Sequence, residues 1–276
     1  MTPTIALTLL LTVTSTGQGT TTDPGPVVTT AWLSTHLADP RVRVIYTGDE
    51  RPDRAHIPGA RFLAHDATMG ASHALLDPQA LAAALARAGA TDEARIVLYG
   101  DAPMATGWLY MAFASIGHAD HVSMLDGNVA AWVAEGRPTS TSTEPPGTGR
   151  LTPRPAPDVI VDAPWVRARL ETPGTRILDV RTDREWRAGH LPGATLVLWQ
   201  DLFSNVSQAR FKPREDIVAI LRRAGAGPDQ EVVTYCAIGM RASLMYFAAR
   251  YAGLRARVYV GSFDDWQRQA GFPIVR

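Results

Sequence analysis

The chain has 276 residues, of which 46% are hydrophobic and 20% are charged, a composition typical of a globular protein with one large core or two smaller ones. Lysine and arginine together number 27, as do aspartate and glutamate, so no overall positive charge attracts nucleic acid or an anionic membrane. We therefore expect no nucleic-acid partner.

The first 26 residues combine a short apolar run with a polar tract. The run at residues 5–13 is too short to span a bilayer but suits the core of a signal peptide, which predicts a periplasmic or secreted protein. The alternative is a disordered start on a cytoplasmic protein, because no Lys or Arg precedes Ile5 and no clear cleavage site follows. No other stretch is apolar for long enough to form a membrane span.

The sequence contains an internal duplication. The landmarks that recur are AHIPGA (55–60) and GHLPGA (189–194), Tyr99 and Tyr235, and Trp132 and Trp266. They keep an offset of 134 to 136 residues, which indicates two copies of one fold. We expect the copies at 27–138 and 159–276, joined by a Pro/Thr/Gly-rich linker at 139–158.

Both copies have the same order of predicted elements, in which helices alternate with strands. The first copy predicts helices at 32–37, 78–88 and 106–116 and strands at 43–46, 95–99 and 121–125. The second copy predicts helices at 165–170, 213–224 and 242–252 and strands at 176–180, 231–235 and 256–260. Each copy closes with a short helix through its tryptophan, which we interpret as a core anchor. This alternation predicts an α/β fold, with a parallel sheet flanked by helices on both faces in each copy and ligands beyond the carboxyl ends of the strands.

Cys236 is the only cysteine and the leading candidate for the chemistry. A single thiol forms neither an intramolecular disulfide nor a zinc site made of cysteines, which leaves the roles of buried filler or nucleophile. The thiol follows a predicted strand and precedes a glycine and a helix, so it faces a helix N-terminus and free backbone N–H groups. Such surroundings, with Arg241 five residues later, stabilise a thiolate and favour the nucleophile.

The chain resembles the tandem-domain rhodaneses, which are thiosulfate and 3-mercaptopyruvate sulfurtransferases. The motifs that carry the resemblance, besides the duplication, are LDVR (178–181), GHLPGA (189–194), CAIGMR (236–241) and Gly-Ser-Phe-x-x-Trp…Gly-x-Pro (261–273). The resemblance implies that Cys236 is the catalytic residue and that the first copy, with Gly100 at the matching position, is inactive and closes one wall of the cleft. It implies no cofactor and no metal.

The implied reaction is a double displacement on sulfur. The Cys236 thiolate attacks the outer sulfur of a small anionic donor such as thiosulfate, and the resulting persulfide passes that sulfur to a small acceptor such as cyanide or a thiol. The groups expected to bind the substrate and the persulfide are the backbone amides of Ala237, Ile238, Gly239 and Met240 and the side chains of Arg181 and Arg241.

Similarity assigns Arg181 to binding of the anionic donor, because a planar guanidinium suits a sulfonate or carboxylate. The alternative is a salt bridge with Asp183 or Glu185.

We interpret Asp179 as a structural acceptor for the N–H groups of the cysteine loop. The histidines of the two Pro-Gly-Ala turns, His56 and His190, are interpreted as turn-stabilising, because the turn is also present in the copy without a cysteine. By analogy, Trp199, Phe211 and Lys212 line the cleft.

Three alternatives stay open. The Cys-x-x-Gly-x-Arg loop is similar to that of many bacterial thiosulfate sulfurtransferases and favours thiosulfate, with 3-mercaptopyruvate as the other donor. Phosphatases related to rhodanese use Cys-x5-Arg, and Arg241 leaves a loop one residue shorter, which disfavours phosphate. The third alternative is a sulfur-relay module that passes its persulfide to a protein partner, for which the inactive copy provides a docking surface.

Overall fold

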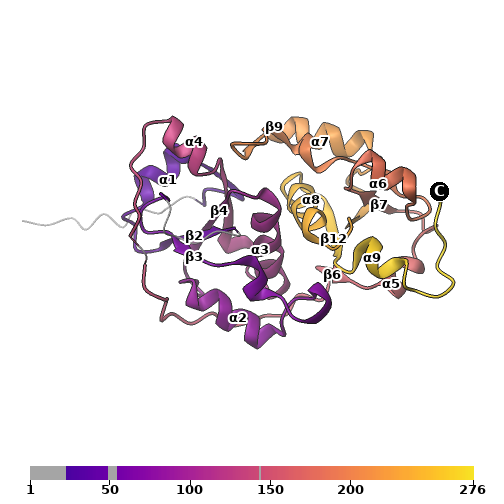
Figure 1. Cartoon of the computed structure of the whole chain (residues 1–276), viewed down its shortest axis with the longest axis horizontal. Helices are drawn as coiled ribbons and strands as arrows, with labels where there is room; N and C mark the ends of the chain where they lie inside the picture. Colours follow the sequence, from indigo (N-terminus) through magenta and orange to yellow (C-terminus); the bar gives the residue numbers. More distant parts are fainter. Residues whose placement is uncertain (1–22, 49–54, 143) are drawn as a thin grey trace, which may run out of the picture.

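The computed structural model describes residues 23–48, 55–142 and 144–276, so the first 22 residues of the predicted signal peptide lie outside it. Figure 1 shows two α/β halves side by side, with helices α3 (Pro103–Ser115) and α8 (Met240–Tyr251) facing each other between them. Within the described residues, no helix is long and apolar enough to cross a membrane.

The N-terminal half is built on a five-stranded parallel sheet in the order β1-β5-β4-β2-β3. Its strands are β1 (Val27–Thr29), β2 (Val42–Thr47), β3 (Arg61–Phe62), β4 (Arg95–Gly100) and β5 (Val122–Asp126). Besides α3, its α-helices are α1 (Thr30–His36), α2 (Pro78–Arg87) and α4 (Val129–Ala134).

The C-terminal half repeats this arrangement in the order β6-β12-β11-β7-β8, again with parallel pairing throughout, so the predicted fold class is confirmed. Its sheet strands are β6 (Ile160–Val161), β7 (Thr175–Asp179), β8 (Thr195–Leu196), β11 (Glu231–Tyr235) and β12 (Arg255–Tyr259). Besides α8, its α-helices are α5 (Ala163–Arg167), α6 (Asp183–Ala188), α7 (Arg214–Arg223) and α9 (Ser262–Trp266).

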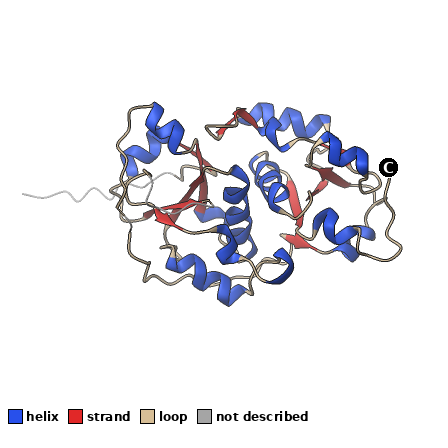
Figure 2. Ribbon diagram, in the orientation of Figure 1, coloured by secondary structure: helices blue, strands red, loops and turns tan. Residues whose placement is uncertain are grey.

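Alternation along the central strands explains why both faces of each sheet carry helices. In β4, Ile96 and Leu98 belong to the core that includes α2 and α3, whereas Val97 and Tyr99 belong to the core beneath α1 and α4. Successive side chains of a strand point to opposite faces, so a continuous apolar run is buried on both sides. Figure 2 shows the helices enclosing the strands of each half. Trp132 and Trp266 are fully buried, as predicted for core anchors.

The two halves share one continuous core through α3 and α8. A Cβ atom at Gly107 would lie 2.6 Å from the Leu244 Cα, so the two helix backbones are in close contact at this point. Tyr110 of α3 packs edge-on against Phe247 of α8, with ring centroids 4.8 Å apart. Because the apolar surface is buried between the halves, their relative position is fixed by packing and not by the linker alone.

The connection at 139–158 contains no helix or strand among its described residues, and it is held against the N-terminal half. Gly147 N–H donates to the Arg87 carbonyl oxygen at 2.7 Å, Arg154 N–H donates to Ile116 at 2.9 Å, and Leu151 is buried. Figure 2 shows this loop running along the outside of the half. The described part of the linker is therefore packed and hydrogen-bonded against the N-terminal half.

A hairpin that the sequence did not predict reaches from the second half to the first. Strands β9 (Phe203–Asn205) and β10 (Arg210–Phe211) form it, and Figure 1 shows it extending from beside α7 towards α4. Its contacts fall on the loop that follows β5 and on the end of α4. Asn128 donates its backbone and side-chain N–H groups to the carbonyl oxygens of Gln208 and Ser207 at 3.0 and 2.9 Å, and the Arg210 guanidinium pairs with Glu135.

Candidate active site

Cys236 lies between β11 and α8, at the carboxyl edge of the second sheet, and its side chain is buried. The Gly239 N–H donates to the Cys236 Sγ at 3.1 Å. Gly239 has a φ of +94°, and a Cβ there would lie 2.8 Å from the Val260 carbonyl oxygen, so both backbone conformation and space require glycine. The loop therefore turns the thiol towards the backbone amide at the N-cap of α8.

The backbone groups of the cysteine loop divide into anchored and open ones. The Cys236 and Ala237 carbonyl oxygens accept from the N–H groups of Phe263 and Asp264 at 2.9 and 3.1 Å. Within the described residues, no acceptor pairs with the N–H groups of Ala237, Ile238 and Met240. The carbonyl side of the loop is thus fixed while its amide side is available to an anion, which is the arrangement expected for a persulfide.

Arg241 is held beside the loop by a bidentate ion pair with Glu185. The guanidinium donates to the two Glu185 carboxylate oxygens at 2.8 and 2.7 Å. Glu185 also accepts from the Thr182 backbone and hydroxyl in a capping box that opens α6, a helix the sequence analysis did not predict. The hydrogen bonds from Arg241 lower the pKa of Glu185 to about 2, and the same pair, together with the nearby Cys236, raises the pKa of Arg241.

Arg181 occupies a buried network and not an open anion site. Its side chain is 4% exposed, and its Nε and Nη2 donate to Asp179 at 3.0 and 2.6 Å. Nη2 also donates to the Gly189 carbonyl oxygen at 2.7 Å, and the guanidinium lies 4.1 Å over the Phe263 ring. The partner is therefore neither of the two carboxylates that the sequence suggested. Because the network leads to the cysteine loop through Phe263, we assign Arg181 a positioning role.

Asp179 has a structural role, but its partners differ from those expected. Its carboxylate accepts from the Arg181 backbone at 2.9 Å and from the Tyr235 hydroxyl at 2.5 Å, instead of from the amides of the cysteine loop. Burial and this carboxylate raise the pKa of Tyr235, whose hydroxyl in turn accepts the Leu191 N–H of the Pro-Gly-Ala turn at 3.1 Å. Asp179 thus connects the end of β7 to the end of β11, directly before Cys236.

Ser262 is the functional candidate that the sequence analysis missed. Its buried hydroxyl accepts the Cys236 N–H at 3.0 Å, donates to the Tyr259 carbonyl oxygen at 2.9 Å and lies 3.9 Å from Sγ. The φ of Ser262 is +54°, a left-handed conformation that costs energy for a residue with a side chain. The available signal was its place in the closing Gly-Ser-Phe motif, whose counterpart in the first copy is Asn128.

The histidines lie in the turns, as interpreted. The His56 backbone pairs with Ser140 and the His190 backbone with Val275, each in an isolated antiparallel bridge. The residues expected to line the cleft by analogy do not line the cavity beside the cysteine loop. Trp199 packs edge-on against Phe203, Phe211 is buried against Phe247, and Lys212 lines a different cavity.

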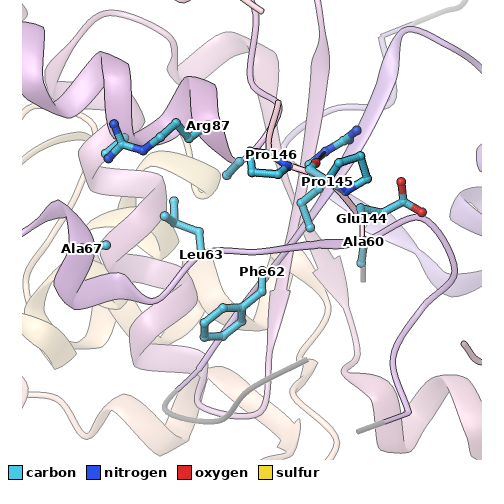
Figure 3. Close-up of a pocket in the computed structure, with 11 residues that line it drawn as sticks. Ala60, Phe62, Leu63, Ala67, Arg87, Glu144, Pro145 and Pro146 are labelled. Atoms are coloured by element: carbon cyan, nitrogen blue, oxygen red, sulfur yellow. Dashed lines mark hydrogen bonds between the residues drawn. The ribbon is translucent and has the colours of Figure 1, made fainter. Parts of the chain in front are cut away.

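Two cavities occupy equivalent places in the two halves. The first, of about 390 Å³, lies between β3 and α2 beneath the linker, where Figure 3 shows Phe62 and Leu63 with Arg87 and the linker prolines. The second, of about 350 Å³, lies between β8 and α7. A cavity that recurs in the copy without a cysteine follows from the fold, so neither one is the candidate active site.

A third cavity, of about 260 Å³, adjoins the cysteine loop at the junction of the two halves. The residues that line it are Ile238, Val260, Gly261, Asp264 and Arg268, with His73 from the N-terminal half. Trp108 of α3 also approaches the loop, since a Cβ at Gly239 would lie 3.4 Å from its ring. The first copy therefore contributes side chains beside the cysteine loop.

Comparisons with known proteins place the chain in a family. A probable 3-mercaptopyruvate sulfurtransferase of Pseudomonas aeruginosa is 32% identical over 80% of this chain and 84% of its own length. A thiosulfate sulfurtransferase of Azotobacter vinelandii is 28% identical over 90% and 96%, and a sulfur carrier protein of Thermus thermophilus is 28% identical over 92% and 97%. The crystal structure of the 3-mercaptopyruvate sulfotransferase of Escherichia coli shares the fold, with a TM-score of 0.76, 22% identity, and coverage of 86% of this chain and 98% of that one. The rhodanese-like domain matches residues 29–135 and 162–269, so the chain belongs to the rhodanese-like family and carries two such domains in tandem.

Proposed function

We propose that this protein is a thiosulfate sulfurtransferase that works through a persulfide on Cys236. The observation that carries the proposal is the cysteine loop: Sγ accepts the Gly239 N–H at 3.1 Å beside amides that have no other partner in the described part of the chain. Amides and a helix N-terminus stabilise a thiolate and then the negative outer sulfur of a persulfide. Charge stabilisation of this kind needs no general base.

The reaction balances without an oxidant. The Cys236 thiolate forms a bond to the outer sulfur of thiosulfate, and the S–S bond of the donor breaks with its electron pair leaving on sulfite. The acceptor nucleophile then bonds to the outer sulfur of the persulfide, and the electron pair of the broken S–S bond returns to Sγ. Arg241, paired with Glu185, places a fixed positive charge beside the loop during both steps.

Thiosulfate is the proposed donor because the Cys-x-x-Gly-x-Arg loop is similar to that of bacterial thiosulfate enzymes and because several relatives carry that name. A second donor, 3-mercaptopyruvate, is supported by the Pseudomonas aeruginosa relative at 32% identity. A relay role is supported by the sulfur carrier relative, and in that case the persulfide passes to a protein.

Steady-state kinetics with the two donors and cyanide as a common acceptor test the proposal. We expect kcat/KM to be at least tenfold higher with thiosulfate than with 3-mercaptopyruvate. The reverse ratio would identify a mercaptopyruvate enzyme, and a stable persulfide without turnover on cyanide would identify a relay.

We also propose that the protein is exported, on the basis of the apolar run at residues 5–13. Intact-mass measurement of the protein purified from its native source gives the mature N-terminus. Removal of a segment that includes the apolar run is the expected result, whereas a chain that retains it would contradict export.

A further inference from the structure

Trp108 of the N-terminal half packs against the part of the cysteine loop that donates to the sulfur. A Cβ atom at Gly239 would lie 3.4 Å from the Trp108 ring and 2.8 Å from the Val260 carbonyl oxygen, so both groups occupy the side on which a side chain would stand. Gly239 is buried, whereas its neighbours in the loop are partly exposed, and its N–H donates to the Cys236 Sγ. The N-terminal half therefore covers the loop residue whose amide bonds to the thiol.

A buried chain of hydrogen bonds holds the Trp108 ring in one orientation. The Trp108 side chain is fully buried, and its Nε1 donates to the Thr68 hydroxyl at 2.9 Å. The Thr68 hydroxyl in turn donates to the His65 carbonyl oxygen at 2.6 Å, within the short helix η1 (His65–Thr68) of the N-terminal half. Because a buried indole N–H that loses its acceptor costs free energy, this chain fixes the ring.

The helix that carries Trp108 is also in close contact with the helix that follows the cysteine loop. Gly107 directly precedes Trp108, and a Cβ at Gly107 would lie 2.6 Å from the Leu244 Cα in the second turn of α8. Leu244 follows Trp108 by 136 residues, the offset that relates Tyr99 to Tyr235, so it is the equivalent residue of α8. The larger of the two equivalent side chains therefore lies on the helix that faces the cysteine loop from the other half.

Resting on the proposed function, we propose that Trp108 is a positioning residue of the active site, which holds the Gly239 amide on the Cys236 sulfur. A glycine has more backbone freedom than other residues, and a hydrogen bond weakens when its donor shifts or tilts. A buried thiolate depends strongly on such a donor, because burial disfavours the charged form. The Trp108 ring fills the space beside Gly239, so it keeps the amide aligned and keeps water from competing for it. The N-terminal half thus acts on the reactivity of the thiol.

Two variants of the N-terminal half, Trp108→Phe and Thr68→Val, test this role and leave the sequence of the cysteine loop unchanged. The readout is the pH–rate profile for alkylation of Cys236 by iodoacetamide, which follows the fraction of thiolate and needs no thiosulfate. We expect the profile to move to higher pH by about one unit in Trp108→Phe and about half a unit in Thr68→Val. These shifts correspond to alkylation that is about tenfold and about threefold slower on the acidic side of the profile.

Trp132→Phe and Thr68→Ser are the matched controls. Trp132 is as fully buried as Trp108 and its Nε1 is also hydrogen-bonded, to the Pro138 carbonyl oxygen, but it belongs to the core beneath α1 and α4. We therefore expect Trp132→Phe to lower the Tm about as much as Trp108→Phe does and to keep the parent alkylation profile. Thr68→Ser retains the hydroxyl that accepts the indole N–H, so it is also expected to keep the parent profile.

Turnover gives a second readout of the same role. With thiosulfate and cyanide, we expect kcat of Trp108→Phe to fall about tenfold while KM for thiosulfate stays within twofold, because the ring acts on the sulfur through Gly239 and not on the donor. Alkylation reports the loop even if the parent protein does not react with thiosulfate, so the positioning role and the proposed function can fail separately.

Parent alkylation profiles in both Trp108→Phe and Thr68→Val would overturn the positioning role. An equal shift in Trp132→Phe would overturn it as well, because the shift would then follow from a general loosening of the fold. If Trp108→Phe does not fold, the comparison of Thr68→Val with Thr68→Ser decides: a shift in the valine variant alone supports the role, and identical profiles contradict it.

Discussion

Gly100 and Cys236 lie at equivalent carboxyl ends of β4 and β11, but only one of the two positions has room for a side chain. A Cβ atom at Gly100 would lie 2.1 Å from the Thr47 carbonyl oxygen and 3.2 Å from the Thr106 hydroxyl. The first copy therefore lacks both the nucleophile and the space for it. Together with the hairpin that covers the loop after β5, this contact supports the prediction that the N-terminal half is a wall of the site and not a second site.

We expect Gly100→Ala to lower the free energy of unfolding by roughly 1–3 kcal/mol, because the added methyl group displaces backbone in a packed core. Chemical denaturation measures the change. Gly227→Ala is the matched control, since no atom lies within 4 Å of a Cβ at that position. Equal stability of the two variants would show that the end of β4 has room for a side chain at position 100.

Gly100→Cys in a Cys236→Ser background tests whether a cysteine in the first copy can carry out the reaction. We expect no thiocyanate from thiosulfate and cyanide, because the new sulfur has no cavity to occupy. Appreciable turnover in this double variant would mean that the first copy retains a site.

Much of this arrangement could be predicted from the sequence. The repeated landmarks and the alternation of helices and strands predict two parallel sheets, and the glycine after Cys236 predicts a tight turn into a helix. Both features depend on local periodicity and spacing, which a single sequence displays.

The pairing of side chains could not be predicted in the same way. Asp179, Asp183 and Glu185 are all close in sequence to Arg181, and the choice among them depends on burial and on the course of α6. The role of Ser262 depends on a left-handed backbone conformation that is unusual for serine, and the Gly-Ser-Phe motif that contains it does not reveal the hydrogen bond to Cys236. The hairpin β9–β10 is short and gains additional hydrogen bonds from the other half of the molecule.

Ser262→Ala removes the acceptor of the buried Cys236 N–H. We expect the free energy of unfolding to fall by about 1–3 kcal/mol and kcat to fall about tenfold, because the cysteine loop loses its anchor. Thermal unfolding and steady-state turnover are the measurements. Ser243→Ala, a buried serine within α8 whose hydroxyl bonds a carbonyl of its own helix, is the control. A normal kcat for Ser262→Ala would leave that serine without a role in the site.

Arg181→Met leaves the buried Asp179 carboxylate without its ion pair. We expect a loss of roughly 3–5 kcal/mol in the free energy of unfolding, the usual cost of breaking a buried pair, with KM for thiosulfate within threefold of the parent value. Denaturation and kinetics on the same preparation separate the two effects. A large rise in KM for thiosulfate with unchanged stability would indicate that Arg181 binds the donor.

The pair of Arg241 and Glu185 gives the protein a defined pH response. The pKa of Glu185 is about 2 in the folded protein against an ordinary 4.5, so the contribution to stability is complete above pH 4.5 and is lost as pH falls towards 2. Because the Glu185 side chain is 33% exposed, we expect no more than about 1 kcal/mol. Glu185→Gln removes this part of the pH dependence between pH 2 and 5, measured by urea unfolding; identical profiles for variant and parent would contradict the assignment.

Mass spectrometry of the protein after incubation with thiosulfate is the most direct test of the central claim. The peptide that contains Cys236 is expected to gain one sulfur atom, to lose it on addition of cyanide, and to gain none in Cys236→Ser. A parent protein that keeps an unmodified Cys236 at saturating thiosulfate, or a Cys236→Ser variant that still produces thiocyanate at the parent rate, would contradict transfer through this thiol.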